Sequence, residues 1–69
     1  MVALRIEAEQ PAERAIARQL ERFGCRVVEE STTELRVEFP DASTERDALV
    51  ETRLYLGMWM RSVVSARAA

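Results

Sequence analysis

Two segments of the sequence alternate between large apolar residues and small or charged ones, and this alternation restricts the fold more than any other feature. Residues 2–7 read Val-Ala-Leu-Arg-Ile-Glu, and residues 34–39 read Glu-Leu-Arg-Val-Glu-Phe. A period of two is typical of a β-strand with one buried and one solvated face. Helices then cover only one face of the sheet, which predicts a two-layer α+β sandwich.

Two residues mark the ends of a helix between these strands. Pro11 suits the first turn of a helix, where an N–H donor is not needed, and Gly24 suits the left-handed residue after a helix end. We therefore expect a helix over residues 11–23. Residues 25–30 form a second strand-like run, and a Ser-Thr-Thr turn joins it to residues 34–39 as a hairpin.

The C-terminal third predicts a long second helix. Ser43 or Thr44 can cap it, and no helix breaker except Gly57 follows, so we expect it to run over residues 43–66. The element order is then β-α-β-β-α in a single domain covering residues 1–69. A right-handed crossover followed by a hairpin gives a three-stranded antiparallel sheet in the order 1-3-2, with both helices on one face. This arrangement is ferredoxin-like but lacks the last strand, which leaves one edge of the first strand free.

The helix expected over residues 43–66 is apolar in more directions than one sheet can cover. At 100° per residue its apolar side chains form three stripes, whereas the first helix has one. A chain of 69 residues has little other surface to cover them, so we predict a homodimer that packs these helices together. The alternative is that the first helix and the C-terminal residues bury all three stripes within one chain. The candidate interface residues are Leu54, Tyr55, Leu56, Met58, Trp59, Met60 and Val63.

Composition restricts the chemistry. The sequence has no His, all ten of its basic residues are Arg, and it has one Cys. Without an imidazole or a primary amine, most nucleophilic and Schiff-base mechanisms are excluded. We therefore expect no enzymatic activity, no cofactor and no metal site. A formal net charge of -2 also gives no general attraction to nucleic acid or to an anionic membrane.

The single cysteine, Cys25, cannot form an internal disulfide, and the N-terminus has no signal-peptide pattern. Both observations favour a cytoplasmic protein. Cys25 itself is expected to be a buried, inert thiol, because no His or Lys is present to lower its pKa.

Arginines recur at every fourth position of the first helix. Such a row can bind an anion, although the glutamates between them also fit an ordinary solvated face. This possible anion patch consists of Arg14, Arg18 and Arg22. The charged face of the sheet is expected to form cross-strand ion pairs, and it has no aromatic residue on which a nucleic-acid base could stack.

The order of these elements resembles a known family. A strand and helix, a charged hairpin, the segment Leu-Arg-Val-Glu-Phe at 35–39, an Asp-Ala-Ser turn and a helix rich in Leu, Trp and Met follow one another. This succession resembles the small dimerising subunit of the KEOPS tRNA-modification complex, the CTAG/Pcc family. The resemblance implies a β-α-β-β-α fold, dimerisation through the helices, docking onto a larger catalytic subunit and no catalysis.

The sequence thus predicts a small, non-catalytic homodimeric accessory or interaction protein that assembles through its C-terminal helix, with a larger protein as a further possible partner. The alternative is an ACT-like regulatory module that binds a small ligand at a dimer interface. An interaction protein leaves an apolar surface exposed in the free dimer, whereas a ligand module buries that surface and has a polar-lined cleft.

Overall fold

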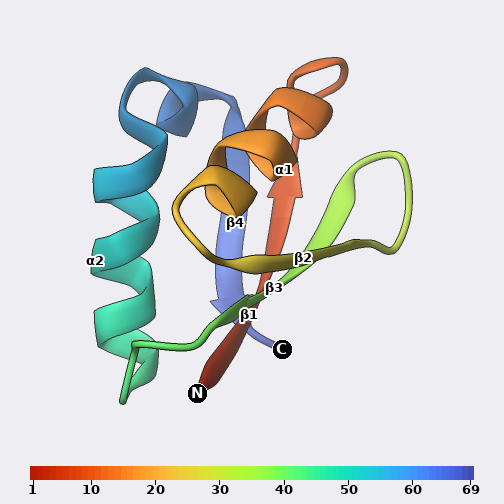
Figure 1. Ribbon diagram of the computed structural model, residues 1–69. Coiled ribbons are helices and arrows are strands. Elements are labelled where there is room, and N and C mark those ends of the chain that lie inside the picture. Colours follow the sequence, from red (N-terminus) through yellow and green to blue (C-terminus); the bar gives the residue numbers. More distant parts are fainter.

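The computed structural model describes all 69 residues of the chain. Four strands, two α-helices and one short 3-10 helix follow one another in the order β-α-β-β-α-β (Figure 1). Their bounds are β1 Val2–Ala8, α1 Ala12–Arg22, β2 Arg26–Glu29, β3 Glu34–Phe39, α2 Glu45–Leu56, the 3-10 helix η1 Gly57–Ser62 and β4 Val63–Ala68.

The four strands form one antiparallel sheet in the order β2-β3-β1-β4. The expected neighbours β1 and β2 do flank β3, but the prediction of three strands is wrong, because β4 pairs with the edge of β1 that was expected to be free. The fold is therefore the complete split β-α-β arrangement of ferredoxin-like proteins. It also has one strand more than the β-α-β-β-α order implied by the KEOPS resemblance.

The prediction of a helix over residues 43–66 is wrong in its second half, because α2 ends at Leu56. Gly57 follows with φ 55° and ψ -120°, and its N–H donates to the carbonyl oxygen of Arg53. Residues other than glycine rarely adopt a positive φ, so the breaker in this apolar run also ends the helix. The 3-10 helix then carries the chain from α2 to the start of β4 (Figure 1).

Strand β4 carries only a weak local signal. Its sequence, Val-Val-Ser-Ala-Arg-Ala, starts with two β-branched residues and then becomes rich in alanine, a strong helix former. Pairing with β1 decides its conformation. The register joins Leu4 to Ala68 and Ile6 to Ala66, with a shift in register between Glu7 and Ala8.

The predicted alternation along the strands is confirmed. The inward residues of β1 and β3 are nearly inaccessible to solvent, and both helices lie against this face (Figure 1). Their inward side chains are Leu4, Ile6, Ala8, Leu35, Val37 and Phe39. Neither helix has the length and apolar character that are needed to cross a membrane.

Local hydrogen bonds fix the end of α1 and the start of α2 as the sequence predicted. Gly24, with φ 92°, follows α1, and the N–H groups of Gly24 and Cys25 donate to the carbonyl oxygens of Glu21 and Leu20. These two bonds form a Schellman motif. At the start of α2 the Thr44 hydroxyl accepts a hydrogen bond of 3.1 Å from the N–H of Asp47.

Candidate interaction surface

Helix α2 and the 3-10 helix after it leave four apolar side chains exposed to solvent. Leu54 is 72% exposed, Met58 is 77% exposed and Trp59 is 41% exposed. Val50 lies one helical turn before Leu54 and is also exposed. We call these four residues, Val50, Leu54, Met58 and Trp59, the α2 apolar surface.

The opposite side of α2 packs on the sheet. Ala48, Thr52 and Leu56 recur every fourth residue and are buried, and the Thr52 hydroxyl donates to the carbonyl oxygen of Ala48 at 2.8 Å. This internal hydrogen bond satisfies the hydroxyl, so a polar residue can lie in the core. Leu56 is only 2% exposed and therefore cannot contact a partner while the chain is folded.

The other candidate interface residues lie between these extremes. Met60 and Val63 are partly buried and pack against the core from η1 and β4. Tyr55 is also partly buried, and its ring stacks on the ring of Phe23 with centroids 4.6 Å apart. The structure therefore divides the seven candidates between the core and the surface.

One hydrogen bond joins α1 to α2 next to this surface. The side-chain amide of Gln19 donates to the carbonyl oxygen of Tyr55 at 3.1 Å, near the C-terminal end of α2. The Tyr55 hydroxyl donates to Glu51 at 2.9 Å. This hydrogen bond, together with burial, raises the pKa of Tyr55 to about 12. The Tyr55 hydroxyl is thus protonated at neutral pH and donates to Glu51.

A hollow lies at the C-terminal end of the α2 apolar surface. Its volume is about 330 Å³, and it is lined by Met58, Trp59, Arg61 and Ser62. Leu54 projects from the neighbouring turn of α2. One surface therefore has both an apolar projection and a hollow of the size that a side chain can enter.

The arginines of α1 are only partly brought together. Arg14 and Arg18 line a hollow of about 380 Å³ between α1 and β2, where Glu21 and Glu29 also lie. Arg22 is exposed in the last turn of α1 and does not line this hollow. The two carboxylates reduce the positive potential that an anion would meet there.

Cys25 is buried directly after α1. Burial raises the pKa of its thiol to about 11, and the negative charges of Glu51 and Asp41 contribute. A thiolate is the nucleophilic form of cysteine, so this environment suppresses reactivity.

Glu13 is a buried carboxylate that the sequence pattern does not reveal. It lies in the first turn of α1, is 8% exposed, and has one oxygen without a hydrogen-bond partner. The positive end of the helix dipole favours its negative charge at this position. No group of three or more His, Cys, Asp or Glu side chains is placed to hold a metal ion.

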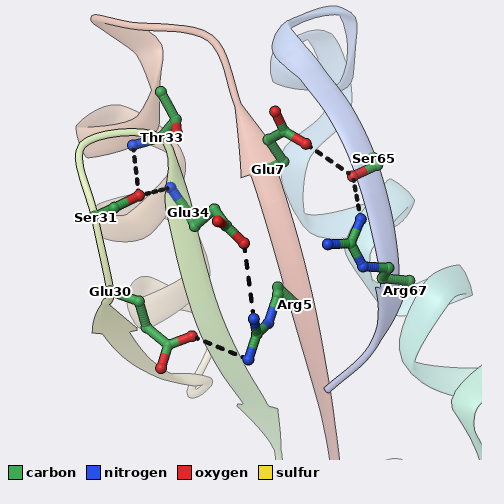
Figure 2. Close-up of polar contacts among 8 residues, drawn as sticks. All are labelled: Arg5, Glu7, Glu30, Ser31, Thr33, Glu34, Ser65 and Arg67. Atoms are coloured by element: carbon green, nitrogen blue, oxygen red, sulfur yellow. Dashed lines mark hydrogen bonds and ion pairs between the residues drawn. The ribbon is translucent and has the colours of Figure 1, made fainter.

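The face of the sheet opposite the helices is charged, and Figure 2 shows part of it. The guanidinium group of Arg5 lies 3.5 Å from Glu30 and 3.9 Å from Glu34. The predicted ion pairs therefore form at Arg5. On β4, the Ser65 hydroxyl donates to Glu7 at 3.4 Å and accepts from Arg67 at the same distance (Figure 2).

Comparisons with known proteins found no relative of this chain. The chain matches no family model, no curated protein and no solved structure. Any functional assignment therefore depends on the surfaces described above.

Proposed function

We propose that this protein is a small, non-catalytic interaction module that forms a homodimer through the α2 apolar surface. The observation that carries the proposal is the exposure of Val50 and Leu54 on α2 and of Met58 and Trp59 on η1. Contiguous apolar surface in a small protein favours a contact with another protein. Aromatic residues and methionine are also enriched at such contacts.

A second copy of the chain is the partner that this surface fits. In a two-fold dimer the same patch lies on both sides of the interface, so the patch must complement itself. Leu54 projects from the surface, and the hollow beside Trp59 is available to receive it. A two-fold axis can therefore insert each Leu54 into the hollow of the other copy, as a knob into a hole.

The chemistry of the chain supports a non-catalytic role. The sequence has no His and no Lys, and the one thiol has a raised pKa. The remaining candidate general bases are carboxylates, and Glu13, which has an unpartnered oxygen, is buried. The module would thus act by assembly, and a larger protein could bind the homodimer.

A single tryptophan makes the proposal directly testable. Trp59 is the only tryptophan in the sequence and belongs to the proposed interface. We expect its fluorescence emission to shift to longer wavelength when a concentrated sample is diluted, because dissociation returns the ring to water. Sedimentation equilibrium should give twice 7.9 kDa in the concentrated sample.

Leu54→Glu tests the contact itself. The position is exposed and helical, and glutamate is a good helix former, so the monomer should fold normally. The variant should stay monomeric at concentrations where the wild type is a dimer. We expect dissociation to be at least about 100-fold easier, because a charge replaces a buried apolar side chain.

Val28→Glu is the matched control. Val28 is also an exposed apolar residue, but it lies on β2, away from α2, and is in register with Arg36. This variant should dimerise like the wild type. A wild-type protein that is monomeric at all accessible concentrations would contradict the homodimer, and a Leu54→Glu dimer as tight as the wild type would place the interface elsewhere.

A regulatory module that binds a small ligand is a second candidate. The polar-lined hollow between α1 and β2, which contains Arg14 and Arg18, favours it. In that case a small anion should bind at Arg14 and Arg18, and Leu54→Glu should leave this binding unchanged.

A further inference from the structure

The register of the sheet places three arginines directly opposite one another. Arg36 of β3 pairs with Arg5 of β1, and Arg5 pairs with Arg67 of β4. Residues opposite each other on neighbouring strands point to the same face, so all three project from the face without helices. Strands are about 4.8 Å apart, and the row therefore spans roughly 10 Å across the sheet. We call it the arginine row.

Most of the positive charge in this row has no counterion within the protein. Only Arg5 has a carboxylate within 4.0 Å, from Glu30 and Glu34. The Arg67 guanidinium donates to the neutral hydroxyl of Ser65, and Arg36 takes part in no ion pair. Like charges directly opposite one another destabilise a sheet. An external anion that bridges them would remove this repulsion.

Carboxylates limit how such an anion can lie. Glu7 and Glu34 face each other in register and form an acidic row on one side of the arginine row. On the other side Glu38 lies opposite Arg26. An anion running along the strands would meet these carboxylates, whereas one lying across the strands would contact Arg36 and Arg67, and at Arg5 it would compete with Glu30 and Glu34. The site thus favours a short anion of roughly 10 Å or less.

We propose that Arg5, Arg36 and Arg67 bind a pyrophosphate group. Each guanidinium presents a planar fork that matches two phosphate oxygens, and a pyrophosphate places two phosphoryl groups side by side. The glutamates on this face form ion pairs only with Arg5, so the guanidinium groups of Arg36 and Arg67 are available to a ligand. The four aromatic residues lie elsewhere, so this face has no ring on which a base could stack.

Inorganic pyrophosphate and ADP carry the same group and serve as the two probes. The wild-type protein is labelled with ¹⁵N and titrated with each probe at low ionic strength, while the arginine Nε–H signals are followed by NMR. We expect saturable shifts at Arg5, Arg36 and Arg67 with one pyrophosphate per chain. Added sodium chloride should weaken binding, because these charges are exposed to solvent.

Two substitutions locate the site. Arg36→Gln and Arg67→Gln should each weaken pyrophosphate binding about tenfold, since each removes a charge-assisted contact. Arg5 is left intact because its ion pairs join β1 to the β2–β3 hairpin. Arg46→Gln is the control, because Arg46 is exposed in the first turn of α2, on the helical side of the sheet. This variant should bind pyrophosphate like the wild type.

Several outcomes would overturn the proposal. These are the absence of saturable shifts with millimolar pyrophosphate, equal binding by Arg36→Gln and Arg67→Gln, and binding of ADP without binding of pyrophosphate. Tighter binding of a single-stranded oligonucleotide would also overturn it, because the ligand would then be a nucleic acid. The result is independent of the proposed dimer, since Leu54→Glu lies on α2 and should bind pyrophosphate normally.

Discussion

Cys25 shows how the environment of one residue determines its chemistry. Its thiol is buried, and its pKa is raised from 9.0 to about 11. At pH 8 we therefore expect slow reaction with iodoacetamide in the native protein and reaction at least about tenfold faster in urea, where the thiol ionises normally. Equal reaction rates of the native and the urea-unfolded protein would contradict a buried thiol with a raised pKa.

The same shift predicts a pH dependence of stability. The folded pKa of Cys25 lies above the unfolded pKa, so the contribution is fully present below pH 9 and is lost as the pH rises towards 11. The loss is at most about 2–3 kcal/mol. Urea unfolding of Cys25→Ala between pH 8 and pH 11 should show a smaller decline than the wild type. An equal decline in the stability of both proteins would mean that other titrating groups cause the pH dependence.

At the scale of the elements, the end of α2 depends on the backbone conformation of Gly57. Gly57 has the dihedral angles of the first central residue of a type II′ turn. An L-alanine side chain would meet no atom within 4 Å there, so only the backbone conformation opposes it. We expect Gly57→Ala to lower the free energy of unfolding by about 1–3 kcal/mol. Chemical denaturation measures this loss.

D-alanine at position 57 is the control. Its preferred angles are the mirror image of those of an L-residue, and they include the conformation of Gly57. Chemical synthesis of the 69-residue chain gives access to this variant. It should be at least as stable as the wild type. If both alanine variants lose the same stability, the methyl group and not the positive φ is the cause.

At the scale of the whole molecule, β4 pairs with the edge of β1 and completes the sheet. Its removal would leave the backbone groups on one side of β1 unpaired, next to the buried side chains of Leu4 and Ile6. We expect a chain ending at Ser62 to lose about the 3–5 kcal/mol that a core of this size supplies, and therefore to unfold or aggregate. Circular dichroism and light scattering measure both outcomes.

A chain that lacks only Ala69 is the control for this truncation. Ala69 follows β4 and donates one backbone hydrogen bond to Ala3. It should fold with nearly the stability of the full chain. A chain ending at Ser62 that unfolds cooperatively at the wild-type temperature would show that β4 contributes little.

Much of the candidate interface could be recognised in the sequence, but its division between core and surface could not. Leu54 and Leu56 are two residues apart, yet Leu54 is exposed and Leu56 is in the core. The periodicity of an isolated helix gives several apolar directions and does not show which one the sheet covers. The orientation of α2 above the sheet makes that choice.

The sequence by itself determined the features that depend on neighbouring residues: the alternating strands, the hairpin, the Gly24 and Thr44 helix ends and the absence of imidazole and amine chemistry. The tertiary structure decided the features that depend on distant pairing. Arg5 and Arg67 are far apart in the chain and meet only because β4 adopts a register on β1. The alanine-rich segment from Val63 to Ala68 has little preference for a strand, and only hydrogen bonding to β1 makes it one.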